Sequence, residues 1–273
     1  MPRNPRATAL TPKKSLGQHF LADGRVVGRI LHAAEVSEED HVLEVGPGRG
    51  ILTRALAARA KRVVAIEMDE ELADRLTFEF QAIDSVTVVT GDARELDVDA
   101  LVPPETSYKV VANLPYYAAS PIVRRFLEAP HKPGLMVFMV QREVARSMAA
   151  SPGDMSLLSV AVQLYGRPSI VSYVPPRAFR PAPKVTSAIV RIDVFKQPAV
   201  AFESPGDFFA VVRAGFSAPR KQIRNSLAHG LATSSEAAEG LLREADIDPR
   251  RRAETLSLQD WDLLYRAHQG QGS

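Results

Sequence analysis

The chain has 273 residues, of which 45% are hydrophobic and 24% are charged, and its formal net charge at pH 7 is +2. This length suits one large domain and a small one, no apolar run is long enough to span a bilayer, and the net charge alone does not indicate a nucleic-acid partner. The lack of cysteine excludes disulfides and thiolate metal sites and fits a cytoplasmic protein.

The first 15 residues, MPRNPRATALTPKKS, contain four basic side chains and no acid. They lack the apolar core that a secretory signal requires, so we expect residues 1–15 to form a flexible basic arm.

Short valine-rich runs alternate with helical patterns after this arm. The predicted strands are residues 41–46, 62–67, 86–91, 108–113 and 135–140, and the predicted helices are residues 51–59, 69–82, 120–128 and 141–150. Nearly continuous apolar character is typical of parallel strands buried on both faces, so the alternation predicts a doubly wound α/β sheet. Two later strands, 168–174 and 187–195, have no clear helix between them and are expected to pair at the sheet edge.

The pattern changes near residue 198. From about residue 205 the chain reads as helices only, with Trp261 as the expected core anchor. We therefore predict an α/β domain over residues 16–198 and a helical domain over residues 199–273. There is no internal repeat and no low-complexity segment.

A glycine-rich loop follows the first predicted strand, within LEVGPGRGILT (residues 43–53). Gly46, Gly48 and Gly50 allow a tight turn and a close ligand approach before a helix. A dinucleotide site would normally read G-x-G-x-x-G, whereas here Ile51 replaces the third glycine, which argues against an NAD-dependent dehydrogenase. Glu44 is a polar residue inside a buried strand.

Acidic residues also follow the next two strands. Glu67 ends the second strand, where it could accept hydrogen bonds from ribose hydroxyls, and Asp92 follows the third, where it could accept one from an adenine amine. Together with the glycine loop, they suit a nucleoside without a pyrophosphate, such as S-adenosylmethionine. The alternative is that both acids only cap the helices that follow them.

The fourth strand ends in VVANLPYYAASP (residues 110–121). A carboxamide, a proline and two aromatic rings at this point could form a slot for a flat base that bears an amine. The alternative is a turn that simply ends the strand.

Several motifs, in order, strongly resemble the ribosomal RNA adenine N6,N6-dimethyltransferase family of the bacterial KsgA type. They are KKSLGQHFL (13–21), EVGPGRGILT (44–53), Glu67, GDA (91–93), NLPY (113–116), FMVQREVA (138–145), AFRPAPKVTSAIVRI (178–192) and FFAVVRAGFSAPRKQIRNSL (208–227). The resemblance covers about residues 13–265. It implies a class I S-adenosylmethionine-dependent methyltransferase fold, Rossmann-like with a seven-stranded sheet, and a small helical C-terminal domain. It implies dimethylation of two adjacent adenosines near the 3′ end of small-subunit rRNA.

The resemblance also implies site residues. The expected S-adenosylmethionine contacts are His19, Leu21, Gly46, Gly48, Glu67, Met68, Asp92, Ala93 and Asn113. The family often has asparagine where this chain has His19, and an apolar residue where it has Arg49. No metal is expected.

Catalysis is expected to depend on holding a poorly nucleophilic amine in place. The Asn113 side chain and the Leu114 carbonyl can each accept an N–H of the adenine amine, and Pro115 fixes the turn. Tyr116 can stack on a base that has left its helix, and Phe179 is the candidate for the opposite face. The alternative for the FRPAPK segment around Phe179 is a connection stiffened by prolines.

Basic residues are concentrated in three segments without acids, residues 1–20, 155–192 and 208–235. Such segregation can create a basic face, and the expected RNA contacts are Lys13, Lys14, Arg180, Lys184, Arg220, Lys221 and Arg224. The alternative is chance clustering on solvated surfaces.

A helix N-terminus is expected within one of these basic segments. We expect Ser217 to cap a helix that begins at Ala218 or Pro219, so that its first two turns place Arg220, Lys221 and Arg224 around one phosphate. The alternative is that these cations pair with acids elsewhere in the fold.

The expected partners are small-subunit rRNA and the precursor of the small ribosomal subunit, with no membrane, and we expect a monomer. One alternative function is methylation of large-subunit rRNA, which confers macrolide resistance. Another is a non-catalytic RNA-binding factor for ribosome assembly, against which the intact Asn113, Tyr116, Glu67 and Asp92 argue.

Overall fold

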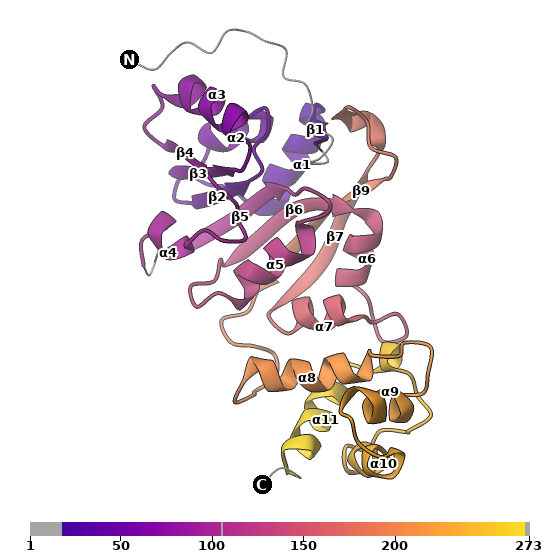
Figure 1. The fold of residues 1–273 in the computed structure, drawn as a ribbon. Coiled ribbons are helices and arrows are strands. Elements are labelled where there is room, and N and C mark those ends of the chain that lie inside the picture. The colour runs from indigo at the N-terminus through magenta and orange to yellow at the C-terminus, as the bar shows by residue number, and fades with distance from the viewer. Residues whose placement is uncertain (1–17, 105, 271–273) are drawn as a thin grey trace. The chain divides into compact units, whose positions relative to one another are not determined.

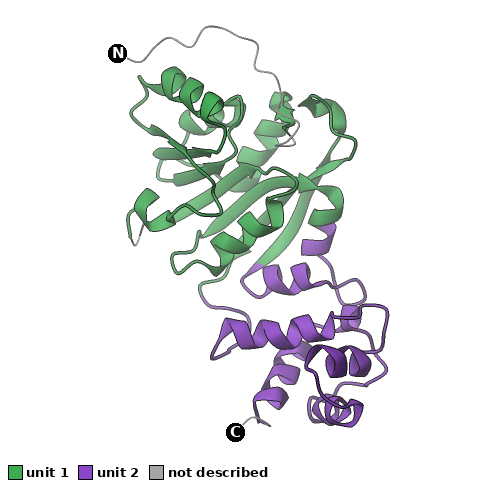
Figure 2. Cartoon of the chain, viewed as in Figure 1, with its two compact units in different colours: residues 1–145, 167–196 green, residues 146–166, 197–273 purple. Residues whose placement is uncertain are grey.

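The computed structural model describes residues 18–104 and 106–270 (Figure 1). The chain divides into two compact units, one of residues 1–145 with 167–196 and one of residues 146–166 with 197–273 (Figure 2). The change of unit after residue 196 lies close to the expected boundary. Residues 146–166, however, group with the helical unit, which the sequence analysis did not foresee.

The first unit contains a seven-stranded mixed sheet with the strand order β4-β3-β2-β5-β6-β9-β7. The strands are β2 (His41–Val45), β3 (Arg62–Glu67), β4 (Val86–Thr90), β5 (Tyr108–Asn113), β6 (Leu135–Gln141), β7 (Gly166–Val174) and β9 (Ser187–Val194). Strands β2 to β6 pair in parallel, and β9 pairs antiparallel with β6. The five predicted parallel strands are thus confirmed, and the two later strands are neighbours at the sheet edge, as predicted.

The strand order creates a crevice. After β4 the chain returns to place β5 on the other side of β2, so the connections that leave β2 and β5 diverge. Ligands of open α/β sheets bind at such a switch point, at the carboxyl ends of the strands.

In the described part of the chain these strands are accompanied by helices, the last of which crosses the boundary between the units. They are α1 (Gly24–Ala34), α2 (Ile51–Ala57), α3 (Glu70–Phe80), α4 (Val98–Leu101), α5 (Ala119–Glu128) and α6 (Arg142–Met148). The sequence analysis predicted α2, α3, α5 and α6 to within a few residues but did not predict α1 or α4. Asp23 caps α1 by accepting a hydrogen bond from the Arg25 N–H.

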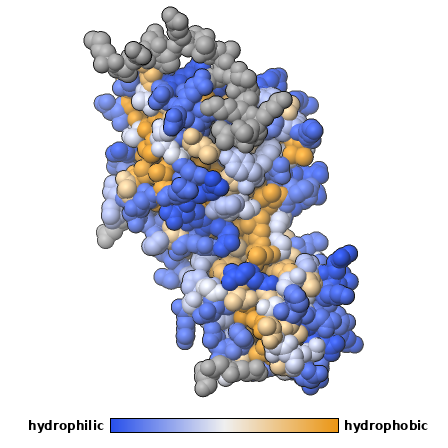
Figure 3. Space-filling view, viewed as in Figure 1, coloured by the Kyte–Doolittle hydropathy of each residue, from blue (hydrophilic) through white to orange (hydrophobic). Residues whose placement is uncertain are grey.

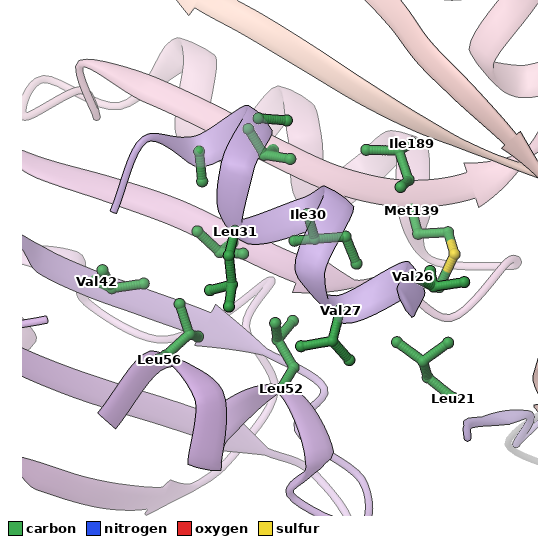
Figure 4. Close-up of a cluster of buried hydrophobic side chains, with 14 of the residues drawn as sticks. Leu21, Val26, Val27, Ile30, Leu31, Val42, Leu52, Leu56, Met139 and Ile189 are labelled. Carbon is green, nitrogen blue, oxygen red and sulfur yellow. The ribbon is translucent and has the colours of Figure 1, made fainter. Parts of the chain in front are cut away.

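Helix α1 has an apolar face, and this face fills the core beside α2. Figure 4 shows Val27, Ile30 and Leu31 of α1 near Leu52 and Leu56 of α2. All five side chains are at most 7% exposed, so removal of apolar surface from water fixes α1 in place.

Polar side chains cover much of the molecular face drawn in Figure 3.

A two-stranded sheet closes the same region. Strand β1 (Phe20–Leu21) pairs antiparallel with β8 (Phe179–Arg180), and Leu21 lies opposite Phe179. A 3-10 turn, η2 (Pro176–Ala178), precedes β8. This pairing joins the start of the described chain to the loop between β7 and β9.

The second unit is helical. It contains α7 (Leu157–Gln163), α8 (Pro205–Gly215), α9 (Ile223–Gly230), α10 (Ser235–Glu244), η3 (Ala253–Thr255) and α11 (Leu258–Gly270). Trp261 is fully buried and packs against Phe216 and Gly215, so its predicted anchoring role is confirmed.

Backbone hydrogen bonds explain why residues 146–166 belong to this unit. The Ala199 N–H donates to the Leu164 carbonyl at 2.8 Å, and the N–H groups of Gly153 and Met155 both donate to the Glu254 carbonyl. Within the described residues no helix is long and apolar enough to cross a membrane.

Candidate active site

Two adjoining pockets open at the carboxyl ends of β2, β3 and β5. The main pocket is lined by residues that include His19, Leu21, Glu44, Gly48, Asn113, Leu114, Tyr116 and Phe179. The side pocket is lined by residues that include Gly91, Asp92, Ala93, Arg94 and Ile122. Gly46, Glu67, Met68, Pro115 and Tyr117 line both. The structure therefore brings all the expected cofactor and catalytic residues to one place.

The glycine loop requires glycine for two reasons. Gly46 and Gly48 have φ angles of 70° and 57°, which side chains rarely adopt. A Cβ atom on Gly46 would also lie 3.3 Å from the Asn113 carbonyl oxygen, and one on Gly48 would lie 3.0 Å from the Phe20 ring. A side chain at either position would therefore be strained by the φ angle and would crowd β5 or β1.

Arg49 connects this loop to β1. Its guanidinium carbon lies 4.6 Å from the centroid of the Phe20 ring, a cation–π contact. The sequence analysis gave Arg49 no role, and the structure provides one because the arginine covers the ring that borders Gly48.

Glu67 joins the glycine loop to the end of β3. Its Oε2 accepts a hydrogen bond from the Gly48 N–H and its Oε1 accepts one from the Asp69 N–H, both at 3.0 Å. Burial raises the pKa of Glu67, against the lowering effect of these N–H donors. Each carboxylate oxygen keeps a second lone pair for a further donor.

The capping alternative for the two acids is wrong. Asp69, not Glu67, caps α3 by accepting from the Glu71 N–H. Asp97, not Asp92, caps α4. Glu67 instead lines both pockets, and Asp92 lines the side pocket.

Asp92 has a partner that the sequence analysis missed. Its carboxylate forms an ion pair with Arg94 and also accepts the Arg94 backbone N–H at 2.9 Å. The Arg94 side chain lowers the pKa of Asp92, which therefore stays ionised at neutral pH. The spacing of two residues in GDAR is a local signal that could have predicted this pair.

Asn113 ends β5 at the edge of the main pocket. Its Nδ2 points to the His19 carbonyl oxygen at 3.5 Å, a long contact, and within the described residues its Oδ1 has no hydrogen-bond partner. The Leu114 N–H donates to the Met139 carbonyl at 3.2 Å, and the Pro115 carbonyl accepts from the Ala118 N–H at 3.0 Å. The NLPY segment is therefore fixed to β6 and to the start of α5.

Tyr116 is held by contacts on two sides. Its hydroxyl oxygen lies 2.7 Å from the Ser187 hydroxyl oxygen, and its ring centroid lies 6.0 Å from that of His19. The Nδ1–H of His19 donates to the Pro181 carbonyl at 2.9 Å, which links this ring to the β7–β9 loop. Burial raises the pKa of Tyr116, so the phenol is neutral at neutral pH.

Two aromatic residues differ from expectation. Phe179 lines the main pocket but is only 1% exposed and pairs with Leu21, so it forms part of the pocket wall. Tyr117, which the sequence analysis left without a role, is 51% exposed, lines both pockets and donates its hydroxyl to the Met68 sulfur at 3.4 Å. The second tyrosine of the NLPYY segment, next to Tyr116, was the sequence signal that could have identified Tyr117 as a pocket residue.

Glu44, like Arg49 and Tyr117, was left without a role by the sequence analysis. It is 1% exposed and lines the main pocket, and its Oε2 has no hydrogen-bond partner within the described part of the chain. Burial raises its pKa to about 8, although the neighbouring Thr53 hydroxyl opposes this effect.

Across residues 18–104 and 106–270 no cluster of acids and histidines suits a metal ion.

The basic residues predicted to contact RNA belong to both units. Arg180 and Lys184 are exposed in the first unit, and Arg220 and Lys221 are exposed in the second. Lys13 and Lys14 lie outside the described residues, as does the predicted arm of residues 1–15.

The predicted helix start at Ala218 or Pro219 is wrong. Helix α9 begins at Ile223, with Gln222 at its N-cap, and Arg220 and Lys221 lie in the turn before it. The Ser217 hydroxyl donates to the Ser226 carbonyl at 3.0 Å instead of capping a helix.

Arg224 also departs from the prediction. It lies in the first turn of α9 and forms an ion pair with Glu239 at 3.0 Å, so the alternative of pairing with an acid is correct for this residue. The side chains of Arg220 and Lys221 have no ion-pair partner in the described ranges.

Comparison with known proteins identifies relatives over nearly the whole chain. The model of the ribosomal RNA adenine dimethylase family matches residues 9–265. Ribosomal RNA small subunit methyltransferase A of Dehalococcoides mccartyi (strain ATCC BAA-2266 / KCTC 15142 / 195) is 46% identical over 255 residues, which cover 93% of this chain and 88% of the relative. The protein of the same name from Moorella thermoacetica is 43% identical, with 97% and 95% covered.

Two solved structures are similar across both units. The 23S rRNA methyltransferase ErmE has a TM-score of 0.71 at 29% identity, with 91% of this chain and 98% of that chain covered. A dimethyladenosine transferase from Plasmodium falciparum has a TM-score of 0.78 at 24% identity, with 93% and 98% covered, which is a likeness of fold.

Proposed function

The chain belongs to the ribosomal RNA adenine dimethylase family, and we propose from this premise that it dimethylates the N6 amines of two adjacent adenosines near the 3′ end of small-subunit (16S) rRNA. It has a class I S-adenosylmethionine-dependent methyltransferase fold with a helical C-terminal region. It is an rRNA adenine dimethyltransferase.

The pockets fit S-adenosylmethionine as the methyl donor. The glycine loop forms a cradle that a Cβ on Gly46 or Gly48 would fill, and Glu44 leaves a buried carboxylate oxygen without a partner beside it. The residues that would hold the cofactor are His19, Leu21, Gly46, Gly48, Glu67, Met68, Asp92, Ala93 and Asn113. When bound, the cofactor supplies a methyl group activated by a sulfonium charge.

The residues of the NLPY segment would position the target amine. The Oδ1 of Asn113 is an acceptor without a partner among the described residues, and the Leu114 carbonyl would provide a second acceptor. Two acceptors on the amine favour a pyramidal nitrogen whose lone pair is available for attack, so catalysis depends on position and electrostatics. The Tyr116 ring, held by Ser187, would stack on the flipped base, and Phe179 would support the pocket wall behind it.

The observation that supports this function most is the shared pocket. The glycine loop and Asn113 line one cavity, and they are so close that a Cβ on Gly46 would lie 3.3 Å from the Asn113 carbonyl oxygen. Direct methyl transfer requires that the methyl donor and the target amine be held in one cavity.

We propose that the RNA partner is the small-subunit precursor, bound by Lys13, Lys14, Arg180, Lys184, Arg220 and Lys221, and that the enzyme acts as a cytoplasmic monomer. The alternative substrate, large-subunit rRNA, has support in the likeness to ErmE. The relatives with 43–46% identity are small-subunit methyltransferases, which favours the small subunit. A non-catalytic assembly factor would not need the complete Gly46, Glu67, Asn113 and Tyr116 site.

Purified small-subunit and large-subunit particles from cells that lack the enzyme test this proposal. We expect methyl transfer from labelled S-adenosylmethionine to small-subunit particles only, and none with the Asn113→Ala variant. Transfer to large-subunit particles would favour the ErmE-like alternative, and transfer to neither would favour the assembly factor.

A further inference from the structure

Met68 differs from the other methionines that the structure describes. The chain contains six methionines and no cysteine, so methionine is the side chain that a peroxide can oxidise reversibly in this protein. Four methionines lie in the core and are at most 4% exposed, namely Met136, Met139, Met148 and Met155. Met68 is 39% exposed. Among the described methionines it is therefore the one that a dissolved oxidant can reach without unfolding of the chain.

Met68 also lies where the two pockets adjoin. It lines both of them, and it stands between Glu67, which ends β3, and Asp69, which caps α3. A small oxidant that enters either pocket can therefore reach this side chain. A chemical change at Met68 would alter the wall of both pockets.

The Tyr117 hydroxyl contacts the sulfur of this methionine. It donates a hydrogen bond to Met68 Sδ at 3.4 Å, and Tyr117 is 51% exposed and lines both pockets. A thioether sulfur is a weak acceptor with two lone pairs, so one lone pair remains for reaction with an electrophilic oxygen. A sulfoxide oxygen is a stronger acceptor than a thioether sulfur. The tyrosine hydroxyl is thus a donor already in position to stabilise the oxidised side chain.

We propose that Met68 is a site of reversible oxidation by hydroperoxides, and that methionine sulfoxide at this position weakens the binding of S-adenosylmethionine. A lone pair of the sulfur attacks one oxygen of hydrogen peroxide, an S–O bond forms and the O–O bond breaks. The proton of the transferred oxygen passes to the departing hydroxide, which leaves as water. The thioether is oxidised by two electrons and the peroxide is reduced by two. Methionine sulfoxide reductases, which take two electrons from a dithiol, restore the thioether.

The loss of affinity rests on the proposed function, which includes Met68 among the residues that hold the cofactor. The thioether offers a ligand an apolar and polarisable surface. The sulfoxide carries a polar oxygen, and a ligand that covers this oxygen removes it from water at a cost in free energy. The dissociation constant should therefore rise by on the order of tenfold. Conversely, a bound cofactor covers Met68 and should slow its oxidation.

Peptide mapping by mass spectrometry, after treatment of the full chain with hydrogen peroxide, tests the assignment of the site. One added oxygen atom should appear at Met68 well before it appears at the four buried methionines. Saturating S-adenosylmethionine, whose sulfonium does not react with peroxide, should slow the oxidation of Met68. Oxidation of the buried methionines as fast as Met68 would overturn the assignment.

Calorimetric affinity for S-adenosylmethionine tests the consequence. Each protein is compared with itself before and after peroxide, so differences in the untreated affinity of a variant do not enter. The wild type should lose affinity by on the order of tenfold and regain it after treatment with reductases for both sulfoxide epimers. Met68→Leu has no sulfur at this position, so peroxide should leave its affinity unchanged. The matched control Met155→Leu removes a buried methionine and should respond to peroxide as the wild type does.

Two results would overturn the inference while leaving the proposed function intact. One is a Met68→Leu protein that loses affinity after peroxide as the wild type does, because oxidation elsewhere would then be responsible. The other needs only the wild type, and it is complete conversion of Met68 to the sulfoxide with unchanged affinity. Failure of the untreated wild type to bind S-adenosylmethionine would instead contradict the proposed function.

Discussion

The hydroxyl oxygen of Tyr116 lies 2.7 Å from the hydroxyl oxygen of Ser187, although 71 residues separate the two in the chain. Ser187 is fully buried at the first position of β9, where it pairs with Gln141 at the end of β6. The hydrogen bond therefore fixes the Tyr116 ring to the sheet rather than to a mobile loop. A ring held in this way can receive a flipped base without first being ordered, which reduces the entropy lost on binding.

The ring, more than the hydroxyl, should matter for activity. Tyr116→Ala removes the stacking surface and should weaken the binding of the target base by about 1–3 kcal/mol. Tyr116→Phe keeps the ring and should retain most of the activity. The measurement is kcat/KM for methyl transfer to small-subunit particles. A Phe variant as inactive as the Ala variant would show that the hydroxyl is the essential group.

A double-mutant cycle isolates the tether. Tyr116→Phe leaves the buried Ser187 hydroxyl without its partner, which should cost about 1–3 kcal/mol of stability at most. Ser187→Ala removes that unpaired group, so the double variant should be no less stable than Tyr116→Phe alone. Urea unfolding of the four proteins checks this, and purely additive losses would mean that the hydrogen bond contributes nothing.

Glu67→Ala should weaken cofactor binding through two losses. It removes the proposed acceptor for the ribose hydroxyls, and it releases the N–H groups of Gly48 and Asp69 that now bond to the carboxylate. A charged hydrogen bond contributes about 1.5–3 kcal/mol, so the Kd should rise by roughly 10- to 150-fold. Glu70→Ala, which removes an exposed acid on α3, is the matched control and should bind normally. Unchanged calorimetric affinity in a folded Glu67→Ala protein would exclude the role.

The raised pKa of Glu44 predicts a stability change with a definite sign. Its pKa rises from 4.5 in the unfolded chain to about 8 in the folded protein, so between these values the folded state binds one more proton. The free energy of unfolding must therefore decrease as the pH rises through this window, by about 1.4 kcal/mol per pH unit from this group. Glu44→Gln lacks this contribution.

Urea unfolding of the cofactor-free proteins at pH 5.5 and 7.5 measures the effect. The stability of Glu44→Gln relative to the wild type should increase between the two pH values, because only the wild type loses stability there. A constant difference would mean that Glu44 is already ionised in the free protein.

The corrected position of α9 changes what is expected of the basic residues before it. Arg220→Ala with Lys221→Ala should make the salt dependence of particle binding shallower by about one to two ions, without a change in cofactor affinity. Arg224→Ala should leave that slope unchanged, because Arg224 pairs with Glu239, and should lower stability by at most about 1 kcal/mol. An unchanged slope in the double variant would leave Arg180, Lys184 and the N-terminal arm as the proposed RNA contacts.

Local patterns were sufficient for much of the fold. Continuous apolar runs predicted the five parallel strands, and the spacing of Gly46, Gly48 and Gly50 predicted the glycine loop. Each of these signals is contained within a few consecutive residues, so it can be read without knowledge of the fold. The convergence of Glu67, Asp92 and Asn113 follows from the rule that parallel strands end at one edge of a sheet.

What was missed or wrong depends on contacts between distant segments. The β1–β8 pairing joins Leu21 to Phe179, and two-residue strands have no periodicity to read. The residues next to Ser217 in the sequence are compatible with a helix cap. In the folded unit, however, the Ser217 hydroxyl donates to the Ser226 carbonyl instead. Residues 146–166 are joined to the rest of the helical unit by backbone hydrogen bonds to residues 199 and 254, which the composition of the segment does not reveal.

The most direct measurement of the central claim is mass spectrometry of small-subunit rRNA from cells that lack this protein. We expect two adjacent N6,N6-dimethyladenosines near the 3′ end to be absent, to return when the wild-type protein is expressed again, and to stay absent when Asn113→Ala is expressed at the same level. Dimethylation that persists without the protein, or that is restored equally by Asn113→Ala, would contradict the account.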